Sequence, residues 1–233
     1  MAAGDCAIPV RGRVLSRLRN WDDRLVFYGF MMDLGTPICN VPVEERGGVM
    51  QQMISVMERL HAKGIVHGDV KLENMLLTSE GMVRFCDFGE GRYVDEDERV
   101  WEGNTMWDFE SPNRLRRAEA VGREPAPPVV EDDLYGLGLS IWQLYTGGVP
   151  HGETAWDDLG LKERQRRGET VDVGVVEDLE AREIIRGLLR GGGAWIGQEV
   201  GLGEEGLGCE TLGTLGSSSA PIIPSSPKNP FIS

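Results

Sequence analysis

The sequence predicts an α+β fold that is mostly helical, with one short β-hairpin and a strand near the amino terminus. Apolar residues recur at helical spacing over residues 49–63, two short apolar runs flank a turn at 78–81, and further helical patterns lie near 156–167 and 177–190. The chain has 233 residues, of which 40% are hydrophobic and 27% charged. A chain of this size and composition buries a substantial core, so we expect a globular protein.

The first helix is predicted from its apolar spacing. Its apolar residues follow the i, i+3, i+4, i+7 pattern of an amphipathic helix; they are Met50, Met53, Ile54, Met57 and Leu60. Gly64 follows, and glycine commonly ends a helix. We expect the methionine stripe to pack in the core and not to line a cofactor pocket, because such stripes are usually buried.

A hairpin is predicted over residues 74–86. Residues 74–77 and 82–86 are short apolar runs, and residues 78–81, Thr-Ser-Glu-Gly, have the composition of a tight turn. Antiparallel pairing of the two runs carries Asn74 and Asp87 to the same end of the hairpin.

Charge and cysteine content exclude several classes of partner. A net charge of −14 disfavours nucleic acid and anionic membranes as partners, since both require clustered Lys and Arg, and it mildly favours basic peptides. The longest apolar run, residues 25–32, is far shorter than the roughly 20 residues of a membrane helix. Residues 1–5 show no secretory signal, and four scattered cysteines without a C-x-x-C pair suit reduced thiols and no zinc site. We therefore expect a cytoplasmic protein, with the nucleus as the alternative.

Two motifs rich in polar residues lie between residues 67 and 89. The run His67-Gly68-Asp69-Val70-Lys71-Leu72-Glu73-Asn74 is followed, after the predicted hairpin, by Asp87-Phe88-Gly89. An ordinary hairpin with an exposed His-Gly-Asp turn would explain either run alone, but not both in register. Together they resemble the catalytic loop and the DFG motif of eukaryotic-type protein kinases.

The resemblance implies a role for each polar residue of these motifs. Asp69 would accept or orient the proton of the attacking hydroxyl, and Lys71 would neutralise the transferring phosphate. Asn74 and Asp87 would hold the Mg²⁺ ions that bridge the phosphates of ATP. Gly68 replaces the Arg that would clamp a phosphate on the activation segment, so we expect no switching by phosphorylation of that segment.

Residues 21–35 are predicted to form a strand that ends in Met32-Asp33-Leu34-Gly35. This end is similar to the kinase hinge, which bonds adenine through its backbone; a buried strand with a glycine turn is the alternative. The resemblance implies that Met32, Asp33, Leu34 and Leu76 contact the nucleotide.

The remaining elements are assigned partly by the same resemblance. Residues 90–110 match an activation segment, and the motif that ends it includes Ser111-Pro112-Asn113. Asn113 occupies the position of a Glu that forms an ion pair in the family. Its presence suggests that the peptide-binding platform is held less firmly. Residues 131–147 resemble the buried central helix, whose Asp133 would brace the catalytic loop, whereas Asp132 would be expendable.

Two further segments are predicted from composition and spacing. We expect the Pro-rich stretch 123–131 to be an exposed loop. The inward face of the last helix would carry Leu179, Ile184, Ile185, Leu188 and Leu189.

The sequence upstream of the hinge lacks what the family uses to cover ATP. No Gly-rich loop and no ATP-positioning Lys precede it, and the first lysine of the chain is Lys63. The resemblance thus covers residues 14–193, mainly the helical C-lobe, as in a fragment of a kinase gene or a natural half-kinase. The pattern G-x-G-x-x-G at 201–206 is no substitute, because no strand leads into it and two carboxylates lie inside it. We expect low activity of the chain alone and a partner that supplies the missing N-lobe.

These observations define three segments and one main function. Residues 1–24 would be an irregular start or a remnant of the N-lobe, 25–193 the kinase-like C-lobe with its hinge, and 194–233 a disordered Gly/Ser/Pro-rich tail. The implied function is ATP- and Mg²⁺-dependent phosphoryl transfer to Ser or Thr of a protein substrate. A pseudokinase-like binding scaffold is one alternative. A small-molecule phosphotransferase of the aminoglycoside or choline kinase-like kind is another, because His-Gly-Asp is the usual form of the catalytic motif in that group.

Overall fold

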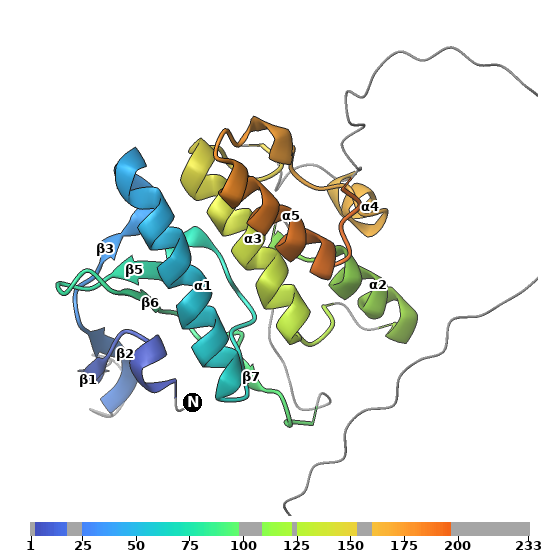
Figure 1. Cartoon of the computed structure of the whole chain (residues 1–233). Helices are drawn as coiled ribbons and strands as arrows, with labels where there is room; N and C mark the ends of the chain where they lie inside the picture. Colours follow the sequence, from blue (N-terminus) through green and yellow to red (C-terminus); the bar gives the residue numbers. More distant parts are fainter. Residues whose placement is uncertain (1–2, 18–24, 98–108, 123–124, 153–159, 197–233) are drawn as a thin grey trace, which may run out of the picture. The chain divides into compact units, whose positions relative to one another are not determined.

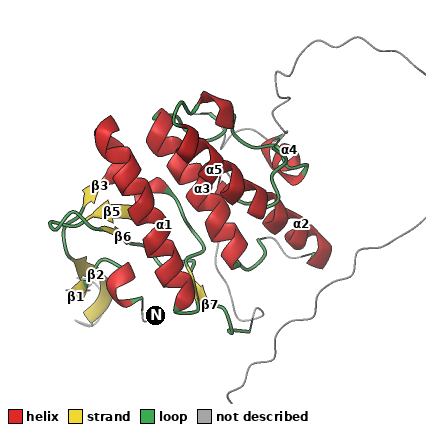
Figure 2. Cartoon of the chain, viewed as in Figure 1, coloured by secondary structure: helices red, strands yellow, loops and turns green. Residues whose placement is uncertain are grey.

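Helix is the most frequent secondary structure in the described chain, and the strands are short (Figure 2). The computed structural model describes residues 3–17, 25–97, 109–122, 125–152 and 160–196. The helices are α1 (Arg46–Ala62), α2 (Pro112–Val121), α3 (Val130–Thr146), α4 (Leu161–Arg166) and α5 (Leu179–Gly191). The prediction of an α+β fold is confirmed.

The described strands form three small antiparallel sheets (Figure 1). The first pairs β1 (Val10–Arg17) with β2 (Leu25–Met32). The second has the order β3-β5-β6, with β3 at Thr36–Pro37, β5 at Met75–Leu77 and β6 at Val83–Phe85. The third pairs β4 (Ile65–Val66) with β7 (Arg92–Tyr93). The predicted hairpin is therefore present as β5 and β6, and β3 adds a third strand to it.

The core forms around α1, α3 and α5. The predicted stripe of α1 is buried: Met50, Met53, Met57 and Leu60 are at most 2% exposed, while Ile54 is partly buried. Helix α3 is buried along most of its length. Helix α5 packs closely against it at Gly138, where an added Cβ would lie 3.0 Å from the side chain of Leu189. On the other side of α3, Gly136 lets the helix approach the loop after β4: a Cβ there would lie 2.5 Å from the carbonyl oxygen of Val70.

Two sequence predictions are corrected by the structure. The Pro-rich stretch is a loop at residues 125–129, but Ala126, Pro127 and Pro128 are buried and not exposed. Their backbone carbonyls accept hydrogen bonds from arginine side chains of neighbouring segments, which holds the loop against the core. Leu179 was expected on the inward face of α5, yet it is 69% exposed because it is the first residue of that helix.

Other expectations meet the limits of the described chain. The helix expected at 156–167 is described only as α4, Leu161–Arg166, and residues 153–159 lie outside the described part. Most of the expected tail, with the pattern at 201–206, also lies outside it, although Ala194 and Ile196 still pack on the core. Strand β1 was not predicted. In the described part of the chain, no helix combines the length and the apolar character needed to span a bilayer.

Candidate active site

Asp133 of α3 binds the backbone of the loop that follows β4. The Asp133 carboxylate is 1% exposed and accepts the backbone N–H groups of His67, at 2.7 Å, and Gly68, at 2.8 Å. The His61 side chain of α1 lies 2.9 Å from the same carboxylate. These contacts fix the start of the loop between α1 and α3, and they match the bracing role expected of Asp133.

His67 anchors the loop from inside. Its ring is fully buried and contacts Phe85 and Phe88, with ring centroids 4.9 and 4.6 Å away. Nε2 lies 3.0 Å from the Cys86 carbonyl oxygen, so Nε2 carries the hydrogen, and Nδ1 accepts the N–H of Asp69 at 3.3 Å. Burial lowers the pKa of His67 and keeps the ring neutral. The neutral ring thereby connects the catalytic-loop motif to the residues around Asp87.

The protonation of His67 predicts how stability depends on pH. Because burial lowers its pKa, the folded protein does not take up the proton that the unfolded chain binds below about pH 6.5. The free energy of unfolding is therefore fully retained above that pH and falls below it, by up to about 1.4 kcal/mol per pH unit for one histidine. Urea unfolding between pH 7.5 and 4.5 measures this slope.

Burial also lowers the pKa of His151, to about 4, so His151 acts in the same direction between pH 6.5 and about 4. The single variants His67→Gln and His151→Gln separate the two contributions, since each should remove part of the slope. Equal stability of the wild type at pH 7 and pH 5 would contradict the expectation.

Asp69 lies at the centre of a cluster of polar side chains. Its Oδ2 accepts from the Lys71 ammonium at 2.7 Å and from the Asn74 side-chain amide at 2.9 Å. The same amide also donates to the backbone carbonyl of Asp69, at 2.9 Å. The Asp69 side chain is only 12% exposed, and Lys71 is 18% exposed. The loop thus holds one carboxylate between a cation and an amide at the edge of solvent.

Asp87 reaches the same region from the far strand of the hairpin. Register pairs Met75 with Phe85, and the N–H of Cys86 donates to the carbonyl of Asn74 at 2.9 Å, so Asp87 and Asn74 lie at one end of the hairpin, as predicted. Asp87 is exposed and has a positive φ of 57°, a region in which Asp is tolerated better than most residues. Its Oδ1 accepts the N–H of Gly89 at 3.3 Å. The carboxylate therefore lies at the surface, in the turn that follows β6.

The predicted hinge residues border this hairpin. Asp33 follows β2; its N–H donates to the Pro9 carbonyl, and its carboxylate pairs with Arg11 at 2.5 Å. Leu34 is 93% exposed. A Cβ on Gly35 would lie 2.6 Å from the Cβ of Leu76, so the backbone after Leu34 packs directly on β5. The structure therefore brings Gly35 and Leu76 together, while Met32 lies at the end of β2 and is 44% exposed.

Comparison with known proteins identifies the family. The family model described as "Protein kinase domain" matches residues 29–189, which is more than half of the chain. The chain belongs to the protein kinase domain family. The match contains both polar motifs, α1, α3 and nearly all of α5.

Serine/threonine kinases are among the curated relatives of this kinase domain. The chain is 30% identical over 117 residues to a probable serine/threonine-protein kinase PknB of Lactococcus lactis, covering 49% of this chain and 17% of that protein. It is 31% identical over 145 residues to ROP17 of Toxoplasma gondii, covering 60% of this chain and 23% of that protein. For RAC-beta serine/threonine-protein kinase B of Xenopus laevis the identity is 30% over 167 residues, 64% of this chain and 30% of that protein. The chain spans less than a third of the length of these relatives.

A buried arginine of the kinase domain was missed by sequence reasoning. Arg114 in α2 is 3% exposed; its guanidinium donates to the carbonyls of Ala126, at 2.8 Å, and Gly68, at 3.3 Å. Desolvation lowers the pKa of Arg114, and nearby Asp132 and Glu110 oppose that effect. With Asp69, these residues line a cavity of about 20 Å³, room for one water molecule. The sequence feature that could have indicated this role is the group of arginines at 114, 116 and 117 near the start of α2. Composition alone does not distinguish buried arginines from arginines on a solvent-exposed helix face.

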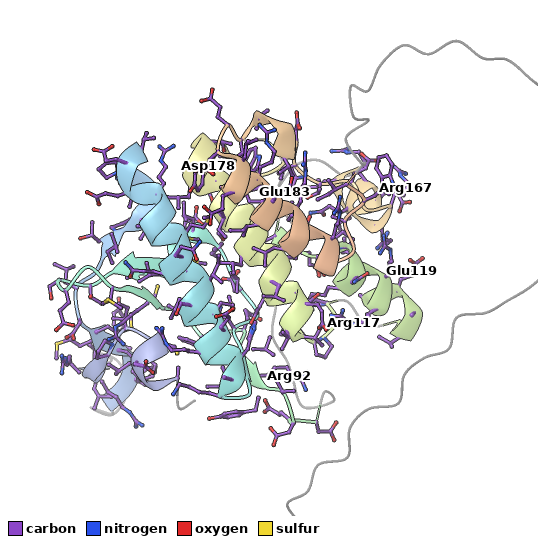
Figure 3. The ribbon with its side chains drawn as sticks, in the orientation of Figure 1. Arg92, Arg117, Glu119, Arg167, Asp178 and Glu183 are labelled. Carbon is purple, nitrogen blue, oxygen red and sulfur yellow. The ribbon has the colours of Figure 1, made fainter. Side chains whose placement is uncertain are left out.

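Asp132 makes specific contacts in addition to placing a negative charge at the start of α3. The prediction that it is expendable is therefore wrong. Its carboxylate is 6% exposed and accepts from the Ser111 hydroxyl at 2.5 Å and from the N–H of Val129 at 2.8 Å. Arg117 pairs with it from α2, and Figure 3 labels this arginine. Asp132 thereby links α2 to the start of α3.

Ser111 caps α2 in turn, accepting the N–H of Arg114 at 2.9 Å. Asn113, in the place of the family's anchoring Glu, instead bonds the Gly191 carbonyl through its amide, at 3.4 Å, and accepts from Arg116 at 3.0 Å. Asn113 is therefore held by hydrogen bonds to α5 and to Arg116 of its own helix.

Proposed function

We propose that this kinase domain transfers the γ-phosphoryl group of ATP to Ser or Thr hydroxyls of protein substrates, with Asp69 as the residue that accepts or orients the hydroxyl proton. The observation that carries the proposal is the Asp69 carboxylate, held by Lys71 and Asn74 at 2.7 and 2.9 Å. A carboxylate fixed in one orientation presents its free edge to a substrate hydroxyl at no further ordering cost. Lys71 would balance charge on the transferring phosphate.

Asn74 and Asp87 have the donor chemistry that Mg²⁺ requires. Both provide oxygen ligands, and Asn74 donates to Asp69 through its amide nitrogen, so its amide oxygen is the atom that would contact the ion. Among the described residues, no cluster of three or more His, Cys, Asp and Glu side chains forms a complete metal site. This suits Mg²⁺, which commonly takes one or two protein ligands and completes its shell with phosphates and water. When bound, the ion supplies positive charge to bridge the phosphates of ATP.

The 33–35 segment and Leu76 form the proposed nucleotide contacts. The backbone around Leu34 provides peptide donors and acceptors at an exposed position, and Leu76 provides an apolar surface directly beneath Gly35. An adenine ring needs both: edge hydrogen bonds for orientation and an apolar face for burial. Met32 and Asp33 precede these contacts in the same segment.

The chain alone is proposed to be a weak enzyme that gains activity from a partner. No lysine precedes Lys63, so residues 1–62 offer no lysine side chain for the phosphates of ATP. Loss of one electrostatic donor aimed at developing charge typically costs about 10²–10³ in rate. The same observation favours a binding scaffold as the second candidate function. Against the scaffold stands the retention of all four polar motif residues, Asp69, Lys71, Asn74 and Asp87.

Nucleotide binding is tested first, because the enzyme and the binding scaffold predict different results. We expect ATP with Mg²⁺ to raise the thermal unfolding temperature of the purified chain, whereas ATP with EDTA should not. At a ligand concentration about 100 times the dissociation constant, binding adds roughly 2.7 kcal/mol to the free energy of unfolding. Differential scanning fluorimetry measures the shift.

Two variants decide whether the shift comes from this site. Asp87→Asn removes the proposed metal ligand and should abolish the Mg²⁺-dependent part. Asp95→Asn is the matched control, since Asp95 is an exposed carboxylate in the segment after Gly89 and should leave the shift intact. A shift that survives in Asp87→Asn refutes the metal role, and no shift at all leaves the scaffold as the function of this chain.

A further inference from the structure

The guanidinium group of Arg114 lies at a junction of three segments of the chain. Its Nε donates to the carbonyl of Ala126 in the Pro-rich loop at 2.8 Å, and its Nη1 donates to the carbonyl of Gly68 in the catalytic-loop motif at 3.3 Å. The backbone of Arg114 belongs to the first turn of α2, where its N–H donates to the Ser111 hydroxyl. One side chain therefore connects the start of α2 to two loops that are distant in sequence.

The burial of this arginine has an electrostatic cost that neighbouring carboxylates offset. Arg114 is 3% exposed, and arginine is rarely buried unless it is paired. Desolvation lowers the pKa of Arg114, whereas the charges of Asp132 and Glu110 raise it. Glu110 is itself 2% exposed, so a buried carboxylate and a buried guanidinium occupy the same region. Displacing either group would leave the other buried charge uncompensated, which favours one fixed arrangement of their segments.

The peptide group before Asp69 is held through these contacts. The N–H of Gly68 donates to Asp133 at 2.8 Å, and the carbonyl of Gly68 accepts from Arg114. That carbonyl belongs to the peptide bond that joins Gly68 to Asp69, so its orientation determines how the backbone enters Asp69. Asp69, Glu110 and Arg114 also line the same cavity of about 20 Å³. Arg114 is thus close to the proposed catalytic carboxylate without binding it.

The glycine at position 68 explains why the cation comes from α2. The common form of the kinase motif has an arginine here, which would bind a phosphate on the activation segment. In this chain Gly68 has a φ of 81°, and a Cβ would lie 2.4 Å from the Glu90 carbonyl oxygen, so a side chain at this position would displace its neighbours. The guanidinium that reaches this part of the loop is that of Arg114, and the nearby anion at the end of the 90–110 segment is Glu110.

We propose that Arg114 is a positioning residue for phosphoryl transfer, which supplies from α2 the cation that position 68 lacks. Its bond to the Gly68 carbonyl fixes the peptide before Asp69, and its charge holds the Glu110 carboxylate against the same loop. A carboxylate is negative without modification, whereas a phosphate must be added, so this link is permanent. The inference rests on the proposed function, because fixing this peptide affects catalysis only if Asp69 serves phosphoryl transfer.

Hydrogen exchange of the backbone amides, measured by mass spectrometry on the full chain, shows how firmly the loop is held. Arg114→Met removes both side-chain hydrogen bonds to the loops and keeps an unbranched apolar side chain. We expect exchange in residues 67–71 to accelerate about tenfold or more, as for the loss of a hydrogen bond to a charged group, while α5 keeps its rate. Equal acceleration in residues 67–71 and in α5 would indicate general destabilisation and overturn the proposal, as would unchanged exchange in 67–71.

Two further variants make this measurement specific. Arg116→Met is the matched control, because Arg116 is an exposed arginine of the same helix whose guanidinium bonds Asn113 and the carbonyls of Arg166 and Gly193. It should leave exchange in residues 67–71 unchanged. Arg114→Lys retains the charge but lacks the planar fork that reaches two carbonyls, so it should give an intermediate rate. If thermal unfolding shows that Arg114→Met does not fold, Arg114→Lys decides by the same criterion.

Steady-state phosphoryl transfer from ATP to a peptide library that contains Ser or Thr tests the catalytic consequence. In Arg114→Met we expect kcat to fall about tenfold or more, with the KM for ATP changed by less than about twofold, because the catalytic carboxylate is misplaced while nucleotide contacts remain. An unchanged kcat overturns the positioning role. A wild type without activity refutes the proposed function, and the exchange rates of residues 67–71 then decide alone whether Arg114 holds the loop.

Discussion

Exchange of Asp133 for asparagine is expected to lower the free energy of unfolding by about 3 kcal/mol. Asp133 is 1% exposed, and both of its oxygens accept hydrogen bonds: Oδ2 from His67 N–H and Oδ1 from Gly68 N–H. An asparagine must put its NH₂ group against one of these two donors, whichever way the amide is turned. The loss therefore includes both a charged acceptor and a buried donor without a partner. Urea unfolding at pH 7 measures it.

The control for this exchange is Asp95→Asn, which removes the same charge from an exposed side chain and should change the free energy of unfolding by less than about 0.5 kcal/mol. The loop that Asp133 braces carries Asp69, so the variant should also weaken any Mg²⁺- and ATP-dependent stabilisation. A loss for Asp133→Asn as small as that of the control would contradict the bracing role.

The parts of the fold that could be predicted from sequence are those with a local signal. The apolar spacing of α1 and the turn between β5 and β6 lie within short windows, so periodicity and turn composition identify them. Strand β1 has no such signal, because its pairing with β2 skips Arg11 between Val10 and Gly12, which is a bulge on β1. A bulge moves the side chains after it to the opposite face, which removes the alternation that marks a strand.

The candidate site divides in the same way. Asp69, Lys71, Asn74 and Asp87 belong to two compact motifs, so their proximity follows from one hairpin. Arg114 and Asp132 contribute through partners far away in the chain, and no local pattern predicts that an arginine of α2 bonds the Gly68 carbonyl. The same contacts explain why a Pro-rich loop is buried. Loops are usually at the surface, and this one is drawn inward because arginine donors satisfy its carbonyls.

The exchange of Gly68 for alanine is expected to destabilise the fold by about 3 kcal/mol, the sum of two costs. Gly68 has a φ of 81°, a left-handed conformation that disfavours any other residue. A Cβ at this position would also lie 2.4 Å from the Glu90 carbonyl oxygen and 3.0 Å from Pro128, and neither neighbour is the end of a flexible side chain. Urea unfolding of Gly68→Ala measures the total.

Gly81→Ala separates conformation from crowding, because Gly81 has a φ of 73° but nothing within 4 Å of a Cβ. It should cost only about 1 kcal/mol. The difference between the two variants is then the cost of displacing the backbone at Glu90, where the segment after Asp87 begins. An arginine at position 68, as in the common form of the kinase motif, would impose that displacement. Gly68 thus allows the loop to pack against Glu90, and position 68 lacks the arginine that would bind a phosphate on the activation segment. Equal losses of unfolding free energy in Gly68→Ala and Gly81→Ala would refute this packing argument.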